Sequence, residues 1–121
     1  MKREVIAVDF DGTLCENAWP YIGEPCHDMI DWIKGLKKLG HKIILWTCRD
    51  GMDLVNAIVW CAEHGLFFDA VNNNLEENIK RYGNNCRKIL ADFYVDDKAI
   101  YPSAVPFIFE RSAYNDDKGN A

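Results

Sequence analysis

Near its amino terminus the chain reads Glu4-Val5-Ile6-Ala7-Val8-Asp9, a short and almost continuously apolar run that ends at a carboxylate. The turn signal Asp11-Gly12 follows directly. A run of this kind, with no alternation of apolar and polar residues, is typical of a parallel strand buried on both faces. We therefore predict a central strand that ends at Asp9, followed by a loop from Phe10 to Glu24, a stretch that contains glycine and proline.

Further along the chain, segments with strand patterns alternate with segments of helical periodicity. Strands are expected over residues 42–47, 67–71 and 88–95, with a final edge strand over 105–109. Helices are expected over residues 29–39, 50–64 and, more weakly, 75–82, with Gly40 and Gly65 as stops and Asp50 as a cap. This alternation predicts an α/β fold: a single Rossmann-like three-layer domain over residues 1–110, with a mainly parallel central sheet and no large cap domain. A polar tail is expected over residues 111–121.

The composition narrows the class of protein. The 121 residues are 49% hydrophobic, which suits one globular core, and the net charge of -5 argues against a nucleic-acid coat or a binder of anionic membranes. No apolar run is long enough for a membrane span or a signal-peptide core, so a cytoplasmic location is expected. The five cysteines include no Cys-x-x-Cys pair, which indicates free thiols in a reducing compartment.

Polar residues stand at the carboxyl ends of three predicted strands. These residues are Asp9, Thr47 and Asp96, with Asp97 next to Asp96. Ligands of open parallel sheets bind beyond the carboxyl ends of the strands, so we expect these side chains to converge on one site.

The same residues carry a resemblance to the haloacid dehalogenase-like superfamily. Its first motif, Asp-x-Asp-x-Thr, is matched by residues 9–13, and its second, a Thr or Ser that ends the next strand, by Thr47. Its third motif is a lysine ahead of the fourth strand, for which we choose Lys88, and its fourth is the acidic pair Asp96-Asp97. The four motifs occur in the family's order over most of the chain, and as a set they are specific.

The resemblance implies a phosphomonoester hydrolase with an aspartyl-phosphate intermediate. Asp9 would be the nucleophile and Asp11 the general acid and base. Thr47 and Lys88 would bind the phosphoryl oxygens of the phosphorylated substrate. With an aspartate at position 11, the chain resembles the phosphatase branch of the family. Dehalogenase relatives lack this second acid, and transport ATPase relatives carry threonine at that position.

The resemblance also implies a magnesium ion. Asp9 and Asp96 would supply carboxylate oxygens, Asp11 a backbone carbonyl, and Asp97 would act through water. Acidic side chains this close together repel one another and a phosphate, and a hard cation with oxygen ligands relieves that repulsion.

Several assignments stay open at the level of the sequence. Arg87 and Lys98 are alternatives to Lys88 as the phosphate-binding cation. Arg49 follows the second motif and is either a substrate-binding residue or a solvated loop arginine. The neighbouring aromatic residues Trp19 and Tyr21 either stack on substrate or pack against the sheet.

The intervals between the motifs are too short for a cap domain, so an open site is expected. A large substrate or a second copy of the chain, as a homo-oligomer, would then cover it. Two other classes of protein compete with the phosphatase. A binding module without activity is disfavoured because every catalytic position is intact, and a signalling receiver domain because its acidic pair comes first in the chain. The identity of the substrate does not follow from the sequence.

Overall fold

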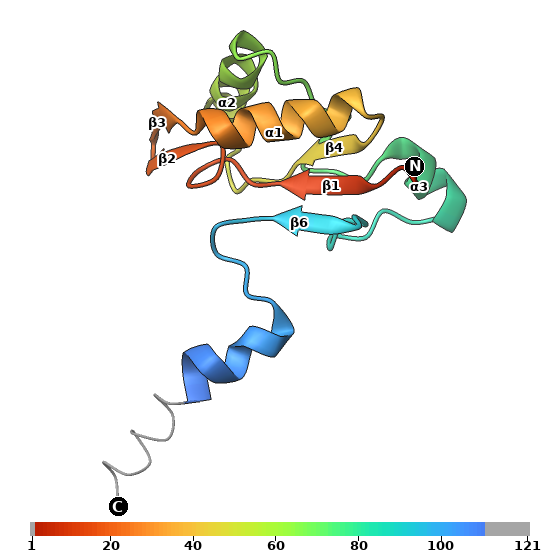
Figure 1. Ribbon diagram of the computed structural model, residues 1–121. Helices are drawn as coiled ribbons and strands as arrows, with labels where there is room; N and C mark the ends of the chain where they lie inside the picture. Colours follow the sequence, from red (N-terminus) through yellow and green to blue (C-terminus); the bar gives the residue numbers. More distant parts are fainter. Residues whose placement is uncertain (1, 111–121) are drawn as a thin grey trace, which may run out of the picture.

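Four short strands form a parallel sheet in the computed structural model, which describes residues 2–110 (Figure 1). The strands lie in the order β5 (Ala70–Val71), β4 (Lys42–Leu45), β1 (Val5–Val8) and β6 (Phe93–Val95). All three pairings are parallel. The expected α/β class with a parallel sheet is therefore confirmed, in one small domain. The expected tail at residues 111–121 lies outside the described residues.

The register of the sheet places the ends of three strands side by side. Val8 of β1 is opposite Leu45 on one side and Val95 on the other. Pairing continues one step further, because the backbone N–H of Asp9 donates to the carbonyl of Val95 at 2.9 Å. The first polar residues beyond β1 and β6 therefore emerge at the same edge of the sheet.

The two faces of the sheet are covered in different ways. On one face, Val8 and Leu45 join a buried cluster with residues of α1 (His27–Lys38) and α2 (Gly51–Glu63), including Ile33 and Cys61. On the other face, a smaller cluster is formed by Ala7, Ile44, Leu75 and Ile89. Its cover comes from the start of α3 (Glu76–Tyr82) and the irregular segment that follows. Because side chains alternate along a strand, each central strand contributes to both clusters.

The segment that was predicted as a loop after β1 contains a β-hairpin. Strands β2 (Cys15–Ala18) and β3 (Tyr21–Pro25) pair antiparallel and form a second, two-stranded sheet. The hairpin is not predictable from the sequence, because β2 exposes three of its four residues and shows no alternation of apolar and polar residues. The turn between the strands contains Trp19 and Pro20, joined by a cis peptide bond.

The predicted edge strand over residues 105–109 is wrong, because this segment is helical. It follows β6 as two short helical segments, η1 (Pro102–Ala104) and η2 (Pro106–Glu110). Each begins with a proline, whose fixed φ suits a first helical position and which has no N–H to donate to a sheet. The predicted strand over 88–95 is shortened to Phe93–Val95 for a related reason: the backbone N–H of Leu90 donates to the side chain of Asn74 instead of to a strand.

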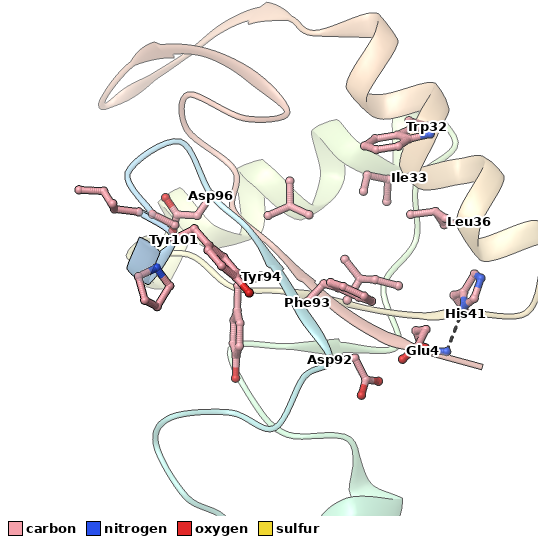
Figure 2. Close-up of a pocket in the computed structure, with 15 residues that line it drawn as sticks. Glu4, Trp32, Ile33, Leu36, His41, Asp92, Phe93, Tyr94, Asp96 and Tyr101 are labelled. Atoms are coloured by element: carbon pink, nitrogen blue, oxygen red, sulfur yellow. Dashed lines mark hydrogen bonds between the residues drawn. The ribbon is translucent and has the colours of Figure 1, made fainter. Parts of the chain in front are cut away.

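An apolar groove of about 790 Å³ lies beside the edge strand β6 (Figure 2). Residues of α1, including Trp32 and Leu36, line one side of it, and Phe93, Val95 and Tyr101 line the other. The segment η1 starts at this groove, since Pro102 belongs to its lining. From there η1 and η2 lead away from the sheet (Figure 1). Among residues 2–110, the helices are too short or too polar to cross a bilayer. All five cysteines are free.

Candidate functional site

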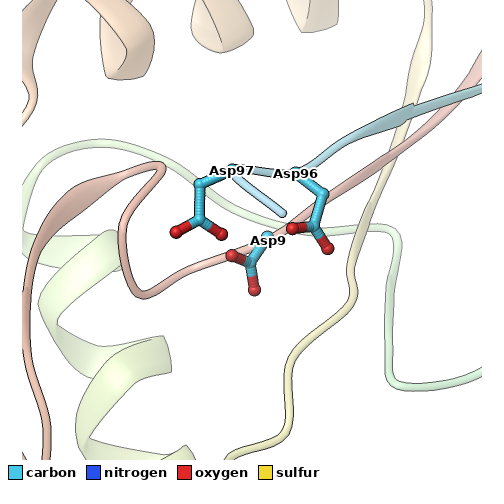
Figure 3. A group of neighbouring side chains, drawn as sticks. All are labelled: Asp9, Asp96 and Asp97. Atoms are coloured by element: carbon cyan, nitrogen blue, oxygen red, sulfur yellow. The ribbon is translucent and has the colours of Figure 1, made fainter. Parts of the chain in front are cut away.

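Three carboxylates meet where β1 and β6 end side by side. Asp9 follows β1, and Asp96 and Asp97 follow β6. One carboxylate oxygen from each residue lies within 4.8 Å of the others. Figure 3 shows the three side chains next to one another. The convergence follows from the register of the sheet, since Val8 and Val95 are paired directly before these residues.

The electrostatics of this cluster are unfavourable without a counter-charge. The pKa of Asp9 is raised from 3.8 to about 6, first by burial and then by repulsion from Asp96 and Asp97, while a hydrogen bond from the backbone N–H of Phe10 opposes the shift. Within the part of the chain that the structure describes, none of the three carboxylates forms a salt bridge. At neutral pH the group is therefore a concentration of negative charge that a cation would stabilise.

The chemistry of the donors fits a hard divalent cation. All three groups offer carboxylate oxygens, which magnesium and calcium prefer over the nitrogen or sulfur ligands typical of zinc. Two of the three residues are exposed, which leaves room for water ligands, and magnesium commonly retains several of these. The side chains that would hold a magnesium ion are thus those of Asp9, Asp96 and Asp97, and the backbone carbonyl of Asp11 stays a predicted ligand.

The carboxylate of Asp11 lies outside that group because it is engaged by Arg49. Its Oδ2 accepts from Nε of Arg49 and its Oδ1 accepts from Nη2, both at 2.8 Å. This is the bidentate geometry of a strong guanidinium–carboxylate pair. The pKa of Arg49 is raised by this hydrogen bond to Asp11, with burial opposing the shift.

Arg49 is not the solvated loop residue that was one of its two expected roles. It is only 2% exposed and stands among the largest fully buried side chains in the described residues. The Cζ atom of its guanidinium lies over the ring of Phe10, 5.1 Å from the centroid, and over the ring of Trp19, 5.0 Å from the centroid. It also donates to the backbone carbonyls of Pro20 and Tyr21 at 3.4 and 3.1 Å. The arginine therefore connects Asp11 to the turn and the second strand of the β2–β3 hairpin.

A cavity of about 360 Å³ collects most of the residues predicted for the site. Its lining contains Asp9, Asp11, Asn17, Trp19, Thr47, Cys48, Arg49, Asp96, Asp97 and Lys98. Six of the predicted residues are in this set, and Lys88 is not. Lys88 is exposed, in the irregular segment ahead of β6. The lysine at the cavity is Lys98, one of the two alternatives that the sequence left open.

The loop that carries Thr47 is held by an asparagine that the sequence analysis did not identify. The side-chain carbonyl of Asn72 accepts from the backbone N–H of Thr47 at 2.8 Å, and its amide donates to the backbone carbonyl of Arg49 at 3.3 Å. The hydroxyl oxygen of Thr47 accepts from the backbone N–H of Arg49 at 3.2 Å. Asn72 follows directly after β5 and has a positive φ of 50°. A polar residue that ends a predicted strand was the signal that could have revealed it.

Gly12 allows Asp97 to approach the turn after β1. The φ of Gly12 is +85°, and a Cβ atom added there would overlap the carboxylate of Asp97. We expect Gly12→Ala to displace Asp97, and to cost about 1–2 kcal/mol of folding stability through the backbone alone. Thermal unfolding and magnesium titration of the variant would measure the two effects.

Gly40→Ala is the matched control for Gly12→Ala. Gly40 has a similar φ of +95°, but no atom lies within 4 Å of the added Cβ. Both variants should lose stability, whereas only Gly12→Ala should weaken magnesium binding. Equal magnesium affinity in the two variants would contradict a role for Asp97 at the cation site.

Comparison with known proteins places the chain in a family without assigning an activity. No protein-family profile matches the sequence, and no curated protein matches it either. A solved structure from Bacteroides thetaiotaomicron, described only as a conserved protein, is 34% identical, with a TM-score of 0.73. The match covers 93% of each chain. The fold and the carboxylate cluster define a small α/β protein with a polar site at the carboxyl edge of its sheet. The chain belongs to the same family as this conserved Bacteroides protein.

Proposed function

We propose that the protein is a magnesium-dependent phosphomonoester hydrolase of the haloacid dehalogenase-like superfamily, with the Rossmann-like fold of that group. The observation that carries the proposal is the convergence of Asp9, Asp96 and Asp97 at the ends of two adjacent parallel strands. Asp11 and Thr47 line the same cavity. A chance cluster of surface acids would not also match the superfamily's first, second and fourth motifs in order at one cavity. The free state of all five cysteines fits a reducing compartment such as the cytoplasm.

In the first half-reaction a carboxylate oxygen of Asp9 attacks phosphorus. A bond forms between that oxygen and phosphorus, and the bond from phosphorus to the ester oxygen breaks. Asp11 donates a proton to the leaving oxygen, so that an alcohol departs. In the second half-reaction Asp11 takes a proton from water, and the water oxygen attacks phosphorus. Inorganic phosphate leaves and the carboxylate of Asp9 is restored.

The substrate carries negative charge into a site that is already acidic. Arg49 is occupied by Asp11, so the positive charge that remains at the cavity comes from Lys98. We therefore assign Lys98 as the cation nearest the phosphoryl group, ahead of Lys88. A bound magnesium ion supplies the rest of the charge compensation. Thr47 offers a neutral hydroxyl for a phosphoryl oxygen.

A panel of phosphorylated compounds tests the proposed activity. Release of inorganic phosphate would be measured with Mg²⁺ for nucleotides, sugar phosphates, phosphopeptides, nucleic-acid ends and p-nitrophenyl phosphate. The same panel with Asp9→Asn protein, purified in parallel, excludes a contaminating phosphatase. Activity confined to the wild-type protein supports the proposal. Tight magnesium binding with no hydrolysis of any compound would indicate a binding module instead.

A further inference from the structure

A fully buried arginine next to the proposed site requires a physical explanation. Removing a guanidinium from water is costly unless charge and hydrogen bonds replace the lost hydration. In Arg49 the replacement is extensive: a carboxylate, the backbone carbonyls of Pro20 and Tyr21, and two aromatic rings within cation–π distance. The structure thus places the buried charge against the one acid that the proposed mechanism needs to move protons.

The contacts of Arg49 come from three parts of the fold. Asp11 follows the central strand β1, the hairpin contributes its turn and the start of β3, and α2 contributes the backbone carbonyl of Asp53, which accepts from Nη1 at 3.4 Å. Both carboxylate oxygens of Asp11 accept hydrogen bonds from the guanidinium of Arg49, so the side chain of Asp11 has a single defined orientation. Any shift of the hairpin turn would move the carbonyls and the indole ring that fix the guanidinium.

We propose that Arg49 is a positioning residue for Asp11, and that it ties the orientation of this carboxylate to the position of the β2–β3 hairpin. The inference rests on the proposed function, because it assigns Arg49 a role in proton transfer to the leaving oxygen. Arg49 touches neither the substrate nor the reacting atoms in this role. The planar guanidinium is essential to this role because it donates hydrogen bonds to both carboxylate oxygens of Asp11. A lysine keeps the positive charge but cannot hold two oxygens in this geometry.

The alternative is a purely structural role, in which Arg49 only anchors the hairpin. The two roles differ in one measurable quantity, the dependence of the rate on the leaving group. An alkyl phosphate needs its leaving oxygen protonated, whereas p-nitrophenyl phosphate releases a stable anion without a proton. Loss of the orientation of Asp11 should slow the alkyl ester more than the aryl ester. A loosened fold should slow both equally.

The test is a double-mutant cycle with Arg49→Lys and Asp11→Asn. The measured quantity is the ratio of kcat/KM for p-nitrophenyl phosphate to that for glycerol 2-phosphate, with Mg²⁺. Acid–base groups contribute about 10²–10⁴-fold, so Arg49→Lys should raise the ratio by roughly 10–100-fold. In the Asp11→Asn background the same substitution should leave the ratio unchanged within about twofold, because no acid remains to be positioned.

Two further variants control for changes in charge and in folding. Arg3→Lys is the matched replacement at an exposed arginine, which pairs with Glu77 far from the site, and it should leave the ratio unchanged. Trp19→Leu removes one ring from the stack at a half-exposed position that tolerates a smaller side chain. It should raise the ratio in the same direction by a smaller factor. If circular dichroism shows that Arg49→Lys does not fold, Trp19→Leu replaces it as the test variant.

The outcomes separate this inference from the proposed function. An unchanged ratio in Arg49→Lys, or an equal rise in the presence and absence of Asp11, would overturn the positioning role and leave the phosphatase proposal intact. If Arg49→Lys does not fold, an unchanged ratio in Trp19→Leu overturns it in the same way. Wild-type protein that hydrolyses neither these two esters nor any compound of the panel overturns the proposed function and this inference with it.

Discussion

Asp9→Asn is expected to abolish hydrolysis of p-nitrophenyl phosphate, with a loss on the order of 10⁶-fold, the size seen when a catalytic nucleophile is removed. An amide oxygen is a poor nucleophile toward phosphorus and a weaker ligand for a divalent cation. Steady-state phosphate release would give the loss. Intact-mass measurement after rapid quench should find a transient phosphoryl group on the wild-type chain and none on the variant.

The fold of this variant should be at least as stable as that of the metal-free wild type. The pKa of Asp9 in the folded protein, about 6, lies above its ordinary value of 3.8, so protonation favours the folded state. The stability of the metal-free wild type should therefore fall as the pH rises from about 4 through about 6. Asparagine does not ionise, and the variant should not show this contribution. Thermal unfolding at pH 5 and pH 7.5 checks the difference.

Asp31→Asn is the matched control for Asp9→Asn. Asp31 is an exposed carboxylate on α1, away from the cavity, and its replacement should change neither turnover nor the pH profile of unfolding. Near-normal turnover in Asp9→Asn would reject Asp9 as the nucleophile. Phosphate found on another residue during turnover would reject it equally.

Removal of divalent cations should be nearly as damaging as loss of the nucleophile. Three carboxylates that lie within 4.8 Å of one another would face a phosphate without compensation, and both binding and attack would be disfavoured. Dialysis against a chelator should therefore eliminate turnover, and added Mg²⁺ should restore it. Magnesium should also raise the unfolding midpoint, since a ligand at 100 times its Kd adds about 2.7 kcal/mol of stability.

The two acids of the pair should not contribute equally to this metal dependence. Asp96 is expected to be a direct ligand and Asp97 to act through water, so Asp96→Asn should raise the magnesium requirement more than Asp97→Asn. Magnesium titrations of activity and of the unfolding midpoint would rank the two variants. Full activity of the wild type in chelator-treated buffer would reject the metal-dependent mechanism.

The centre of the fold and the acidic part of the site were predictable because they depend on short, regular patterns. The apolar run before Asp9 can be buried on both faces only as a strand inside a sheet, and the run before Thr47 follows the same rule. Parallel strands end at the same edge, so the order of elements predicts that Asp9 and Asp96 lie at one edge of the sheet. Their close approach follows from the pairing of β1 with β6, which the structure adds.

The remainder depends on contacts that no local pattern encodes. Arg49 looks like a surface residue because charged side chains are usually exposed, and only its partners explain its burial. The polar strand β2 forms through backbone pairing with β3, and the pattern of its side chains does not predict this pairing. The choice between Lys88 and Lys98 depends on the path of the chain on either side of β6, and spacing along the sequence does not determine that path.

The cation site has a mechanical consequence that comes from the position of β6. This strand has three residues, lies at the edge of the sheet and pairs only with β1 among the described strands. A cation held by Asp9, Asp96 and Asp97 would link the edge strand to the central strand at their common end. Amide hydrogen exchange in Phe93–Val95 should then slow when magnesium is added, while exchange in the hairpin stays the same. The ion would therefore stabilise the pairing of the edge strand β6 with β1, in addition to its part in the proposed catalysis.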